Sequence, residues 1–501
     1  MIELDGATLT LDALDRIAHG DESVRLSPDA MTRVRAAREV VDRHAAGGAA
    51  VYGINTGFGA LADVAIPADQ LSALQLNLLR SHAAGVGEPL PVPVVRALLA
   101  LRANVLAKGY SGIRVGTIEA LIALLNARVH PRVPARGSVG ASGDLAPLAH
   151  LALVLVGEGD TLDGRSGADA LAQAGLRPVS LAPKEGLALI NGTQASTALL
   201  ALAVLEATRL TRVADIAAAL STDALRGSFH PFEARIHDAR PVPGQGASAA
   251  NLRQLVTGSA INASHANCGK VQDAYALRCA PQVHGAAREA IAFAARLAET
   301  EANAATDNPM VFVEDAAIVS GGNFHGAPIA LAADTLAIGL AQLATISERR
   351  TDRLLTADES GLPPFLTRTS GVSSGLMMAH VTAAALTAEI KSLAHPSAVD
   401  TIPTSAGRED HVSMSMGATL KVARAIELAE HVVAIELLAG SQALDLLAPL
   451  VTSPPLAGVH RAVRQVVPAL TVDRSPAPDI DRIVTLVRAG TIERACQVTL
   501  H

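Results

Sequence analysis

Aromatic side chains are nearly absent from this sequence. Its 501 residues include three tyrosines, seven phenylalanines and no tryptophan, so that aromatics make up 2% of the chain. Hydrophobic residues nevertheless account for 50%, which means that the core has to be aliphatic and rich in alanine and leucine. A core of that composition favours helices. We therefore expect a mainly α-helical fold.

Cysteine is equally scarce, since the chain has only Cys268, Cys279 and Cys496. An odd number without paired spacing argues against a disulfide framework and against a zinc site. The pattern is typical of a protein in the reducing cytoplasm. The first residues, Met-Ile-Glu-Leu-Asp-Gly, also lack the basic and apolar segments of a secretory signal.

Positive charge is in short supply as well. Lysine and arginine number 41 against 48 acidic residues, which gives a net charge of -7. The chain therefore offers no basic field for nucleic acid and no polybasic face for a membrane. Residues 186–205 carry no charge, but their polar side chains predict a buried loop and helix and not a membrane span. Small molecules are the expected partners.

One stretch, residues 137–150, stands out by its composition and reads Gly-Ser-Val-Gly-Ala-Ser-Gly-Asp-Leu-Ala-Pro-Leu-Ala-His. Three glycines within its first seven residues let the backbone adopt angles that other residues avoid, so the segment can fold back on itself. Asp144 suits a helix N-cap and Pro147 suits the first helical turn. A helix is therefore predicted to begin directly after the glycine turn.

The tripeptide Ala141-Ser142-Gly143 can condense into an electrophile. If the amide nitrogen of Gly143 attacks the carbonyl carbon of Ala141, a five-membered ring closes with loss of water. Loss of a second water from Ser142 then leaves an exocyclic methylidene. Glycine offers the least hindered nitrogen, serine carries the hydroxyl that leaves, and alanine crowds the attacked carbon little. The alternative is an ordinary glycine-rich turn that caps a helix.

The whole fourteen-residue string resembles the signature of the aromatic amino acid ammonia-lyases and aminomutases. Their prosthetic group is 4-methylidene-imidazol-5-one (MIO). The resemblance implies that MIO forms here autocatalytically from Ala141, Ser142 and Gly143, which would be catalytic, with no metal or nucleotide cofactor. It extends over almost the whole chain and is densest from about residue 50 to 450.

Three further motifs carry the same resemblance. The loop at residues 51–59, Val-Tyr-Gly-Ile-Asn-Thr-Gly-Phe-Gly, resembles the family loop whose tyrosine removes the β-proton of the substrate. This implies that Tyr52 is the base, whereas the alternative is an aromatic that anchors the loop. Asn191 would bind the backbone of the amino acid and support the MIO oxygen. Phe324, in the glycine turn at residues 320–325, would pack beside the MIO ring.

Another group of candidate residues follows a spacing of three: Gln272, Tyr275 and Arg278. A helix would place them on one side. The resemblance implies that Arg278 grips the substrate carboxylate, for which its guanidinium fork is suited, while Gln272 binds substrate and Tyr275 is catalytic. The alternative for the arginine is a salt bridge. Ala274 and Ala276 stand where the family more often has proline and serine.

The ring of the substrate is expected to meet Ser81, His82 and Glu409. Ser-His at positions 81 and 82 resembles the histidine ammonia-lyases, as does a glutamate at 409, where phenylalanine enzymes usually have glutamine. The alternatives are a histidine that interacts with a helix C-terminus and an exposed acidic helix start. Gly407-Arg408 departs from the commoner Asn-Gln, which adds positive charge near the pocket.

The predicted architecture is a long-helix bundle core with a smaller mixed N-terminal region. Residues 1–190 form the region that carries the Tyr52 loop and the MIO turn, and residues 191–501 form the bundle domain. One or two strands are expected within the first twenty residues, and a helix is expected to end at Thr306–Pro309. Helical patterns cover about residues 27–44, 68–82, 91–108, 113–128, 196–220, 326–355, 375–394 and 415–448. The last three patterns are apolar on more than one face, which is typical of the interior of a bundle.

The resemblance implies an ammonia-lyase that acts on an aromatic L-amino acid, assembled as a homotetramer with shared active sites. L-Histidine is the preferred substrate, with trans-urocanate and ammonia as products, because His82 and Glu409 can hydrogen-bond an imidazole ring. The alternatives are a tyrosine, phenylalanine or dihydroxyphenylalanine (DOPA) ammonia-lyase, an aminomutase, and an inactive helical scaffold. The G-x-S-x-G string at 371–375 lacks the preceding strand that a serine hydrolase needs.

Overall fold

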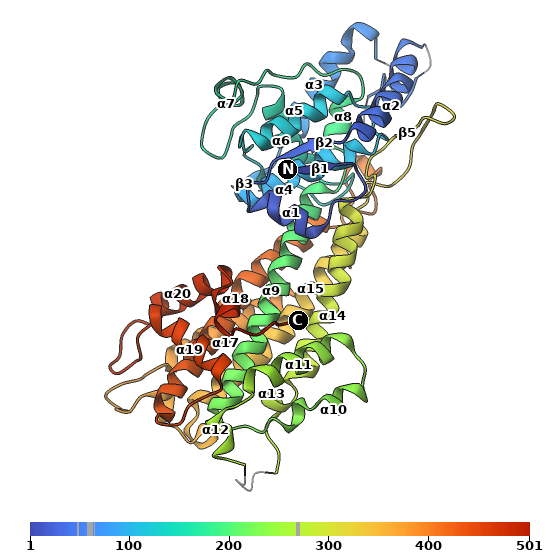
Figure 1. Ribbon diagram of the computed structural model, residues 1–501. Coiled ribbons are helices and arrows are strands. Elements are labelled where there is room, and N and C mark those ends of the chain that lie inside the picture. Colours follow the sequence, from blue (N-terminus) through green and yellow to red (C-terminus); the bar gives the residue numbers. More distant parts are fainter. Residues whose placement is uncertain (48–49, 58–63, 65, 267–270) are drawn as a thin grey trace. The chain divides into compact units, whose positions relative to one another are not determined.

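The computed structural model describes residues 1–501 except 48–49, 58–63, 65 and 267–270. Helices dominate this part of the chain, and the strands within it form three two-stranded sheets (Figure 1). Two compact units are each assembled from three separate stretches. Unit 1 comprises residues 1–202, 294–334 and 396–420, and unit 2 comprises residues 203–293, 335–395 and 421–501. The predicted fold class is confirmed.

Unit 1 contains all the described strands. β1 (Ile2–Leu4) pairs in parallel with β2 (Val24–Leu26), whereas β3 (Val86–Pro89) with β4 (Pro134–Arg136) and β5 (Met310–Phe312) with β6 (Ala317–Val319) are antiparallel. The α-helices that lie wholly within unit 1 are α1 (Leu11–Ala18), α2 (Pro28–Ala46), α3 (Leu71–His82), α4 (Val92–Ala107), α5 (Val115–Asn126), α6 (Leu145–Leu155), α7 (Gly167–Gln173) and α8 (Glu185–Ile190). α6 packs against both α3 and α8.

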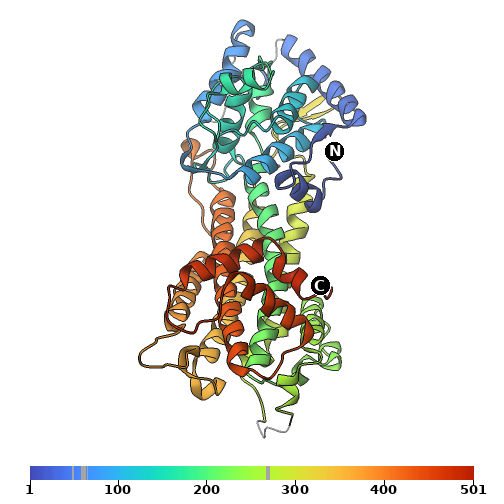
Figure 2. The ribbon, with the colours of Figure 1, turned by 60° about the vertical axis from the view of Figure 1, so that its left-hand side comes forward.

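Unit 2 contains helices and no strands among its described residues. Its own α-helices are α10 (Ala234–Asp238), α11 (Pro243–Val256), α12 (Ala260–Ala263), α13 (Tyr275–Arg278), α16 (Ala357–Ser360), α17 (Met377–Leu393), α19 (Pro454–Val466), α20 (Ala477–Arg488) and α21 (Thr491–Ala495). Four long helices contribute residues to both units: α9 (Gln194–Ala224), α14 (Ala280–Ala302), α15 (Ala327–Leu355) and α18 (Ser415–Leu447). Figure 2 shows them from a second side.

The helical patterns read from the sequence are confirmed, often to within two residues. α2 starts after Ser27, whose hydroxyl accepts a hydrogen bond from the Ala30 amide at the helix start. α15, α17 and α18 match the three long patterns. α17 differs from the expected interior helix, because only Ala379, Ala383, Thr387 and Ile390 are buried along it. Within the described chain its other faces are open.

Several short elements differ from the sequence-based expectation. The predicted second strand near the start is a helix, α1, because Leu14 and Ile17 lie one turn apart on its buried face and Thr10 caps it. β3 to β6 were not predicted, since three or four residues are too few to show a period of two. α14 ends at Ala302, four residues before the predicted end, so that Thr306–Pro309 lies in the connection that follows.

α15 is the one helix in the described residues that is long and apolar enough to cross a membrane by length and composition. Two thirds of its apolar window, 67%, is buried inside the protein, as expected for a core helix. Cys279 and Cys496 are free thiols. Cys268 lies outside the described residues, as do Phe58 and Gly59 of the predicted Tyr52 loop.

Candidate active site

The predicted MIO turn is a tight turn that only glycine can complete. Gly143 has a φ of +74°, in the left-handed region that side chains disfavour. A Cβ atom at this position would lie 2.2 Å from the carbonyl oxygen of Gly192. That oxygen accepts a hydrogen bond of 2.7 Å from the amide of Asp144. The turn is therefore pressed against the segment that follows α8.

A second segment holds the turn from another side. Gly140 also has a positive φ, +67°, and a Cβ there would lie 2.2 Å from Ser413 Oγ. The Ser413 hydroxyl donates to the Gly140 carbonyl at 3.0 Å, and the Met414 amide donates to the Val139 carbonyl at 2.8 Å. Segments far apart in the sequence thus fix the backbone around Ser142.

Asp144 occupies the predicted N-cap position of α6, but its side chain makes no capping bond there. Its carboxylate instead accepts hydrogen bonds from the Ser196 amide at 2.7 Å and the Ser196 hydroxyl at 2.8 Å, at the start of α9. Burial raises the pKa of Asp144 to about 6, although the bonds from Ser196 oppose the rise. The residue therefore joins two helix starts beside the turn.

Asn191 lies where the sequence predicted a residue in contact with the turn. It ends α8, and its Nδ2 donates to the Ser142 carbonyl oxygen at 3.2 Å. Its Oδ1 is buried and, within the described part of the chain, has no hydrogen-bond partner. Arg102 of α4 fixes the Asn191 backbone by donating to its carbonyl at 2.9 Å. A buried acceptor without a partner is typical of a ligand position.

Glu409 faces the turn as well. Its Oε1 accepts a hydrogen bond of 3.2 Å from the Ser142 hydroxyl. Instead of starting an exposed helix, it lies in a loop before α18 that pairs it with Thr404. The alternative of an acidic helix start is therefore wrong.

His82 ends α3 as predicted, next to Ser81. Its Nδ1 lies 2.9 Å from the Leu78 carbonyl, which can only accept, so Nδ1 carries the proton and the neutral ring keeps Nε2 as an acceptor. Burial lowers the pKa of His82, while the charge of Glu409 acts in the opposite direction. The Ser81 hydroxyl donates to the same carbonyl at 3.1 Å.

Tyr52 lies in a turn supported by the core of unit 1. Ile54, two residues later, is fully buried in a cluster with Val40 and Val311. A Cβ on Gly53, which has a φ of +77°, would lie 2.8 Å from Leu187 of α8. The turn therefore packs on the helix that ends at Asn191.

Phe324 lies half-buried in a turn before α15. The next residue, His325, bonds through Nε2 to the His411 carbonyl at 3.1 Å, and the two imidazole rings stack with centroids 5.8 Å apart. The turn is thus tied to the segment that directly follows Glu409.

The remaining candidates belong to unit 2. α13 contains Tyr275 and Arg278, but Gln272 precedes it in an irregular segment, so the predicted single helical face is wrong for Gln272. The Arg278 guanidinium carbon lies 4.6 Å from the centre of the Tyr275 ring. Arg278 Nε is buried without a hydrogen-bond partner among the described residues, whereas Tyr275 is 70% exposed. Among the described residues Arg278 makes a cation–π pair with Tyr275 and no salt bridge, which was the alternative.

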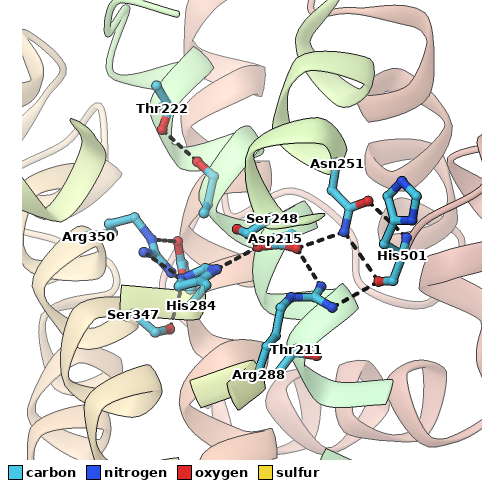
Figure 3. A network of polar contacts seen from close by, with 12 residues as sticks. Thr211, Asp215, Thr222, Ser248, Asn251, His284, Arg288, Ser347, Arg350 and His501 are labelled. Atoms are coloured by element: carbon cyan, nitrogen blue, oxygen red, sulfur yellow. Dashed lines mark hydrogen bonds and ion pairs between the residues drawn. The ribbon is translucent and has the colours of Figure 1, made fainter. Parts of the chain in front are cut away.

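A buried polar network of unit 2 surrounds Asp215, His284 and Arg350 (Figure 3), and Arg350 links it to α13. Arg350 donates to the Ala276 carbonyl at 3.5 Å and forms a bidentate ion pair with Glu436 at 2.5 and 2.9 Å. It also donates to His284 Nε2 at 3.3 Å, so that His284 Nδ1 must donate to Asp215 at 2.7 Å. Burial lowers the pKa of His284. Burial would raise the pKa of Asp215, but the bond from His284 and the charge of Arg288 lower it to about 2.

The structure thus brings Ser142, Asn191 and Glu409 into direct contact within unit 1. The charge of Glu409 acts on the pKa of His82. Tyr52 and Phe324 lie on segments that contact α8 and the loop of Glu409, respectively. Gln272, Tyr275 and Arg278 form a separate group in unit 2. Sequence reasoning missed Arg102 and Thr404. For Arg102 the available signal was an arginine inside a mostly apolar helix, a signal that it shares with Arg96.

The residues around the turn fit the MIO group. The ring would form from the backbone of 141–143, where Gly143 already has the compact conformation that a Cβ would prevent. Asn191 offers Nδ2 to the carbonyl of Ser142 and leaves Oδ1 for a donor. Gly143 would allow the ring to form, and Asn191 would hold it.

Comparison with known proteins defines the family. The sequence model of the aromatic amino acid lyases matches residues 9–465. A curated histidine ammonia-lyase from Anaeromyxobacter sp. (strain K) is 54% identical, over 98% of this chain and 99% of that protein. The crystal structure of histidine ammonia-lyase from Trypanosoma cruzi superposes with a TM-score of 0.92 at 45% identity, covering 99% of this chain and 95% of the other. Tyrosine aminomutase from Streptomyces globisporus superposes with a TM-score of 0.95 at 37% identity, with 100% of both chains covered.

The chain belongs to the aromatic amino acid lyase family. The predicted resemblance is confirmed, and with it the enzyme class, a carbon–nitrogen lyase of the ammonia-lyase type.

Proposed function

We propose that this protein eliminates ammonia from L-histidine to give trans-urocanate. The observation that carries the proposal is the placement of Glu409 at the Ser142 hydroxyl, with His82 close by. An imidazole ring offers an N–H group to one of these acceptors, and to both when it is protonated, whereas a phenyl ring offers none. A site built to hydrogen-bond a substrate rejects an analogue that lacks the donor. The histidine ammonia-lyases among the relatives support this choice.

The residues of the chain divide the work around the reacting carbon atoms. Arg278 binds the substrate carboxylate through its guanidinium fork, and Asn191 holds the side of the molecule that carries the amine. Tyr52 takes the β-proton, and Tyr275 is the second catalytic tyrosine. Ser81, His82, Gln272, Phe324 and Glu409 shape the pocket for the ring. The MIO group supplies the electrophile that makes the amine a good leaving group.

The active form is a homotetramer in the cytoplasm whose sites are built from more than one subunit. Support comes from unit 2, where apolar side chains are open to solvent in the single chain, among them Ile338 at 44%, Met378 at 59% and Val381 at 49%. Tyr275, Val283 and Ile338 also line an apolar cavity of about 520 Å³. Faces of this kind are typical of subunit interfaces. The exposed helix α17 is the element that an assembly would cover.

A substrate panel tests the proposal. The purified protein is incubated with histidine, tyrosine and phenylalanine, while product formation is followed by ultraviolet absorbance and by chromatography for β-amino acids. We expect urocanate from histidine at the highest kcat/KM. Faster turnover of tyrosine would reject the substrate assignment.

An aminomutase is the second candidate, because tyrosine aminomutase from Streptomyces globisporus shares the fold over its full length. A β-amino acid product would identify it. Intact mass decides whether the chain is an inactive scaffold, since formation of MIO removes two waters. Wild-type protein should show this loss and the Ser142→Ala variant should not.

A further inference from the structure

Glu409 is held by a short, unusually wound loop. Thr404 and Glu409 face each other in an antiparallel bridge, in which the Thr404 amide donates to the Glu409 carbonyl at 3.0 Å. Between them Ser405 has a φ of +51° and Ala406 one of +53°, angles that residues with a side chain disfavour. Such a backbone persists where surrounding contacts determine it, and it is found most often at functional sites. The loop therefore fixes the backbone position of Glu409.

The two oxygens of the Glu409 carboxylate have different partners. Oε2 accepts a hydrogen bond of 2.5 Å from the Thr404 hydroxyl, whereas Oε1 accepts one of 3.2 Å from the Ser142 hydroxyl. The Ser142 hydroxyl is the group that is lost when the prosthetic group forms. Oε1 then loses its partner, while Oε2 keeps Thr404. A carboxylate held by one oxygen cannot turn freely, so the other oxygen stays aimed into the site.

We propose that Thr404 is a positioning residue that sets the specificity for an imidazole ring, because it locks Glu409 with Oε1 available to a ring N–H. This inference rests on the proposed function. The Thr404 hydroxyl bonds Glu409 and not Ser142, so Thr404 acts only through Glu409. Because the bond to the ring is equally present in the ground state and the transition state, its loss affects KM more than kcat.

The test compares Thr404→Val, which keeps the shape and removes the hydroxyl, with Thr404→Ser, which keeps the hydroxyl. A hydrogen bond to a charged group is worth enough for roughly a tenfold change in binding. We expect KM for histidine to rise about tenfold in Thr404→Val, with kcat changed less than about threefold, and Thr404→Ser to restore KM. The loss of two waters by intact mass should be the same in both variants.

Thr117 provides the matched control. It is a buried threonine of unit 1 whose hydroxyl donates to another carboxylate, Glu185, at 2.7 Å. Thr117→Val removes the same type of bond from a carboxylate whose hydrogen-bond partners, Arg114, Thr117 and Ala182, are not site residues. It should lower the thermal midpoint and leave KM unchanged. If Thr117→Val raises KM as much as Thr404→Val does, the effect is general destabilisation and the inference is overturned.

A double variant shows whether Thr404 acts through Glu409. In a Glu409→Ala background, Thr404→Val should have no further effect on kcat/KM. Equal effects in the presence and absence of Glu409 would overturn the inference. The outcomes are distinct from a failure of the proposed function. Wild-type protein without urocanate production would reject both, whereas an active wild type with an unchanged Thr404→Val variant rejects only the role of Thr404.

Discussion

At the scale of single residues, the turn at 141–143 depends on Gly143 for two separate reasons. Its φ of +74° disfavours any side chain, and the Gly192 carbonyl occupies the place that a Cβ would take, 2.2 Å away. The first effect is a matter of backbone strain and the second a direct overlap. Some other glycines, Gly175 among them, show only the first effect, so the two effects can be separated by experiment.

We predict that Gly143→Ala prevents maturation. The methyl group has to displace the turn from Gly192, which moves the residue 143 nitrogen away from the Ala141 carbonyl. Intact mass should lack the loss of two waters, and activity should fall at least roughly a hundredfold, as expected for misplaced reacting atoms. Gly175→Ala is the control, because Gly175 has a φ of +70° and nothing within 4 Å of its Cβ position. A dehydrated Gly143→Ala protein would contradict the prediction.

Individual site residues could be predicted where a motif carried them. Asn191 and Glu409 were placed by resemblance, and both contact Ser142. The orientation of Asp144 could not be predicted, because its partner Ser196 is 52 residues away and is brought close only by the packing of α9. Thr404 could not be predicted either, because a hydroxyl aimed at one carboxylate oxygen has no signature in residue order.

At the scale of elements, the pair of strands β3 and β4 and the helix α6 connect the end of α3, which carries Ser81 and His82, with the turn that contains Ser142. β3 follows the Ser81-His82 end of α3, and β4, its partner, leads directly into the MIO turn. His150 of α6 adds a second connection, because its Nε2 accepts a hydrogen bond of 3.0 Å from the Gly85 amide. Since an amide can only donate, the ring must be neutral at Nε2, in line with the lowered pKa that burial gives His150.

We predict that His150→Leu destabilises unit 1 by about 2 kcal/mol, because the Gly85 amide is left half-buried without its acceptor. Chemical denaturation measures the loss, and hydrogen exchange should show faster exchange of the peptide that contains Gly85. His150→Gln, whose side-chain oxygen can accept the bond, should recover much of the loss. His130 is the control, since its Nε2 is buried with no hydrogen-bond partner among the described residues. If His130→Leu speeds exchange at Gly85 equally, the bond is not the cause.

Long elements were predicted well because periodicity accumulates over many turns. α15 begins at Ala327 and ends at Leu355 against a predicted 326–355, and α18 covers Ser415–Leu447 against 415–448. α13 shows the opposite case. Its four residues are too few to establish a period, and the segment from Gln272 to Ala274 remains outside the helix.

At the scale of the whole molecule, the candidate residues are divided between the two units. Tyr52, Asn191 and Glu409 belong to unit 1, whereas Tyr275 and Arg278 belong to unit 2. If sites are shared between subunits as proposed, a defect in one unit can be complemented by a different chain.

We predict that Tyr52→Phe and Arg278→Lys, each inactive alone, regain activity when coexpressed. With random assembly about a quarter of the sites would receive an intact unit 1 from one chain and an intact unit 2 from another. Urocanate production by the purified mixture measures this fraction. Coexpressed Tyr52→Phe and Glu409→Ala should stay inactive, because both changes fall in the same unit. Failure of the first pair to regain activity would place each site within one chain.

The buried network of unit 2 predicts a pH dependence of stability. Burial lowers the pKa of His284 in the folded protein, so below about pH 6.5 the unfolded chain binds a proton that the folded chain does not. Stability is therefore lost as the pH falls, with a limiting slope of about 1.4 kcal/mol per pH unit from this group. His284→Gln keeps a donor for Asp215 and an acceptor for Arg350 without titrating.

Chemical denaturation of wild type and His284→Gln between pH 7.5 and 5.5 tests this. The wild type should lose stability relative to the variant as the solution becomes more acidic. Parallel curves would show that His284 does not titrate differently in the two states.

The division of unit 1 into three stretches has a consequence for how the protein is made. Ser142 meets Glu409 across 267 residues of intervening sequence, and unit 1 is complete only with residue 420. During translation the turn at residues 141–143 therefore leaves the ribosome long before the loop that contains Glu409 has been synthesised. If the dehydration of Ser142 requires the contact with Glu409, it occurs only after most of the polypeptide has been synthesised. Nascent chains stalled before residue 404 should then carry an unmodified serine.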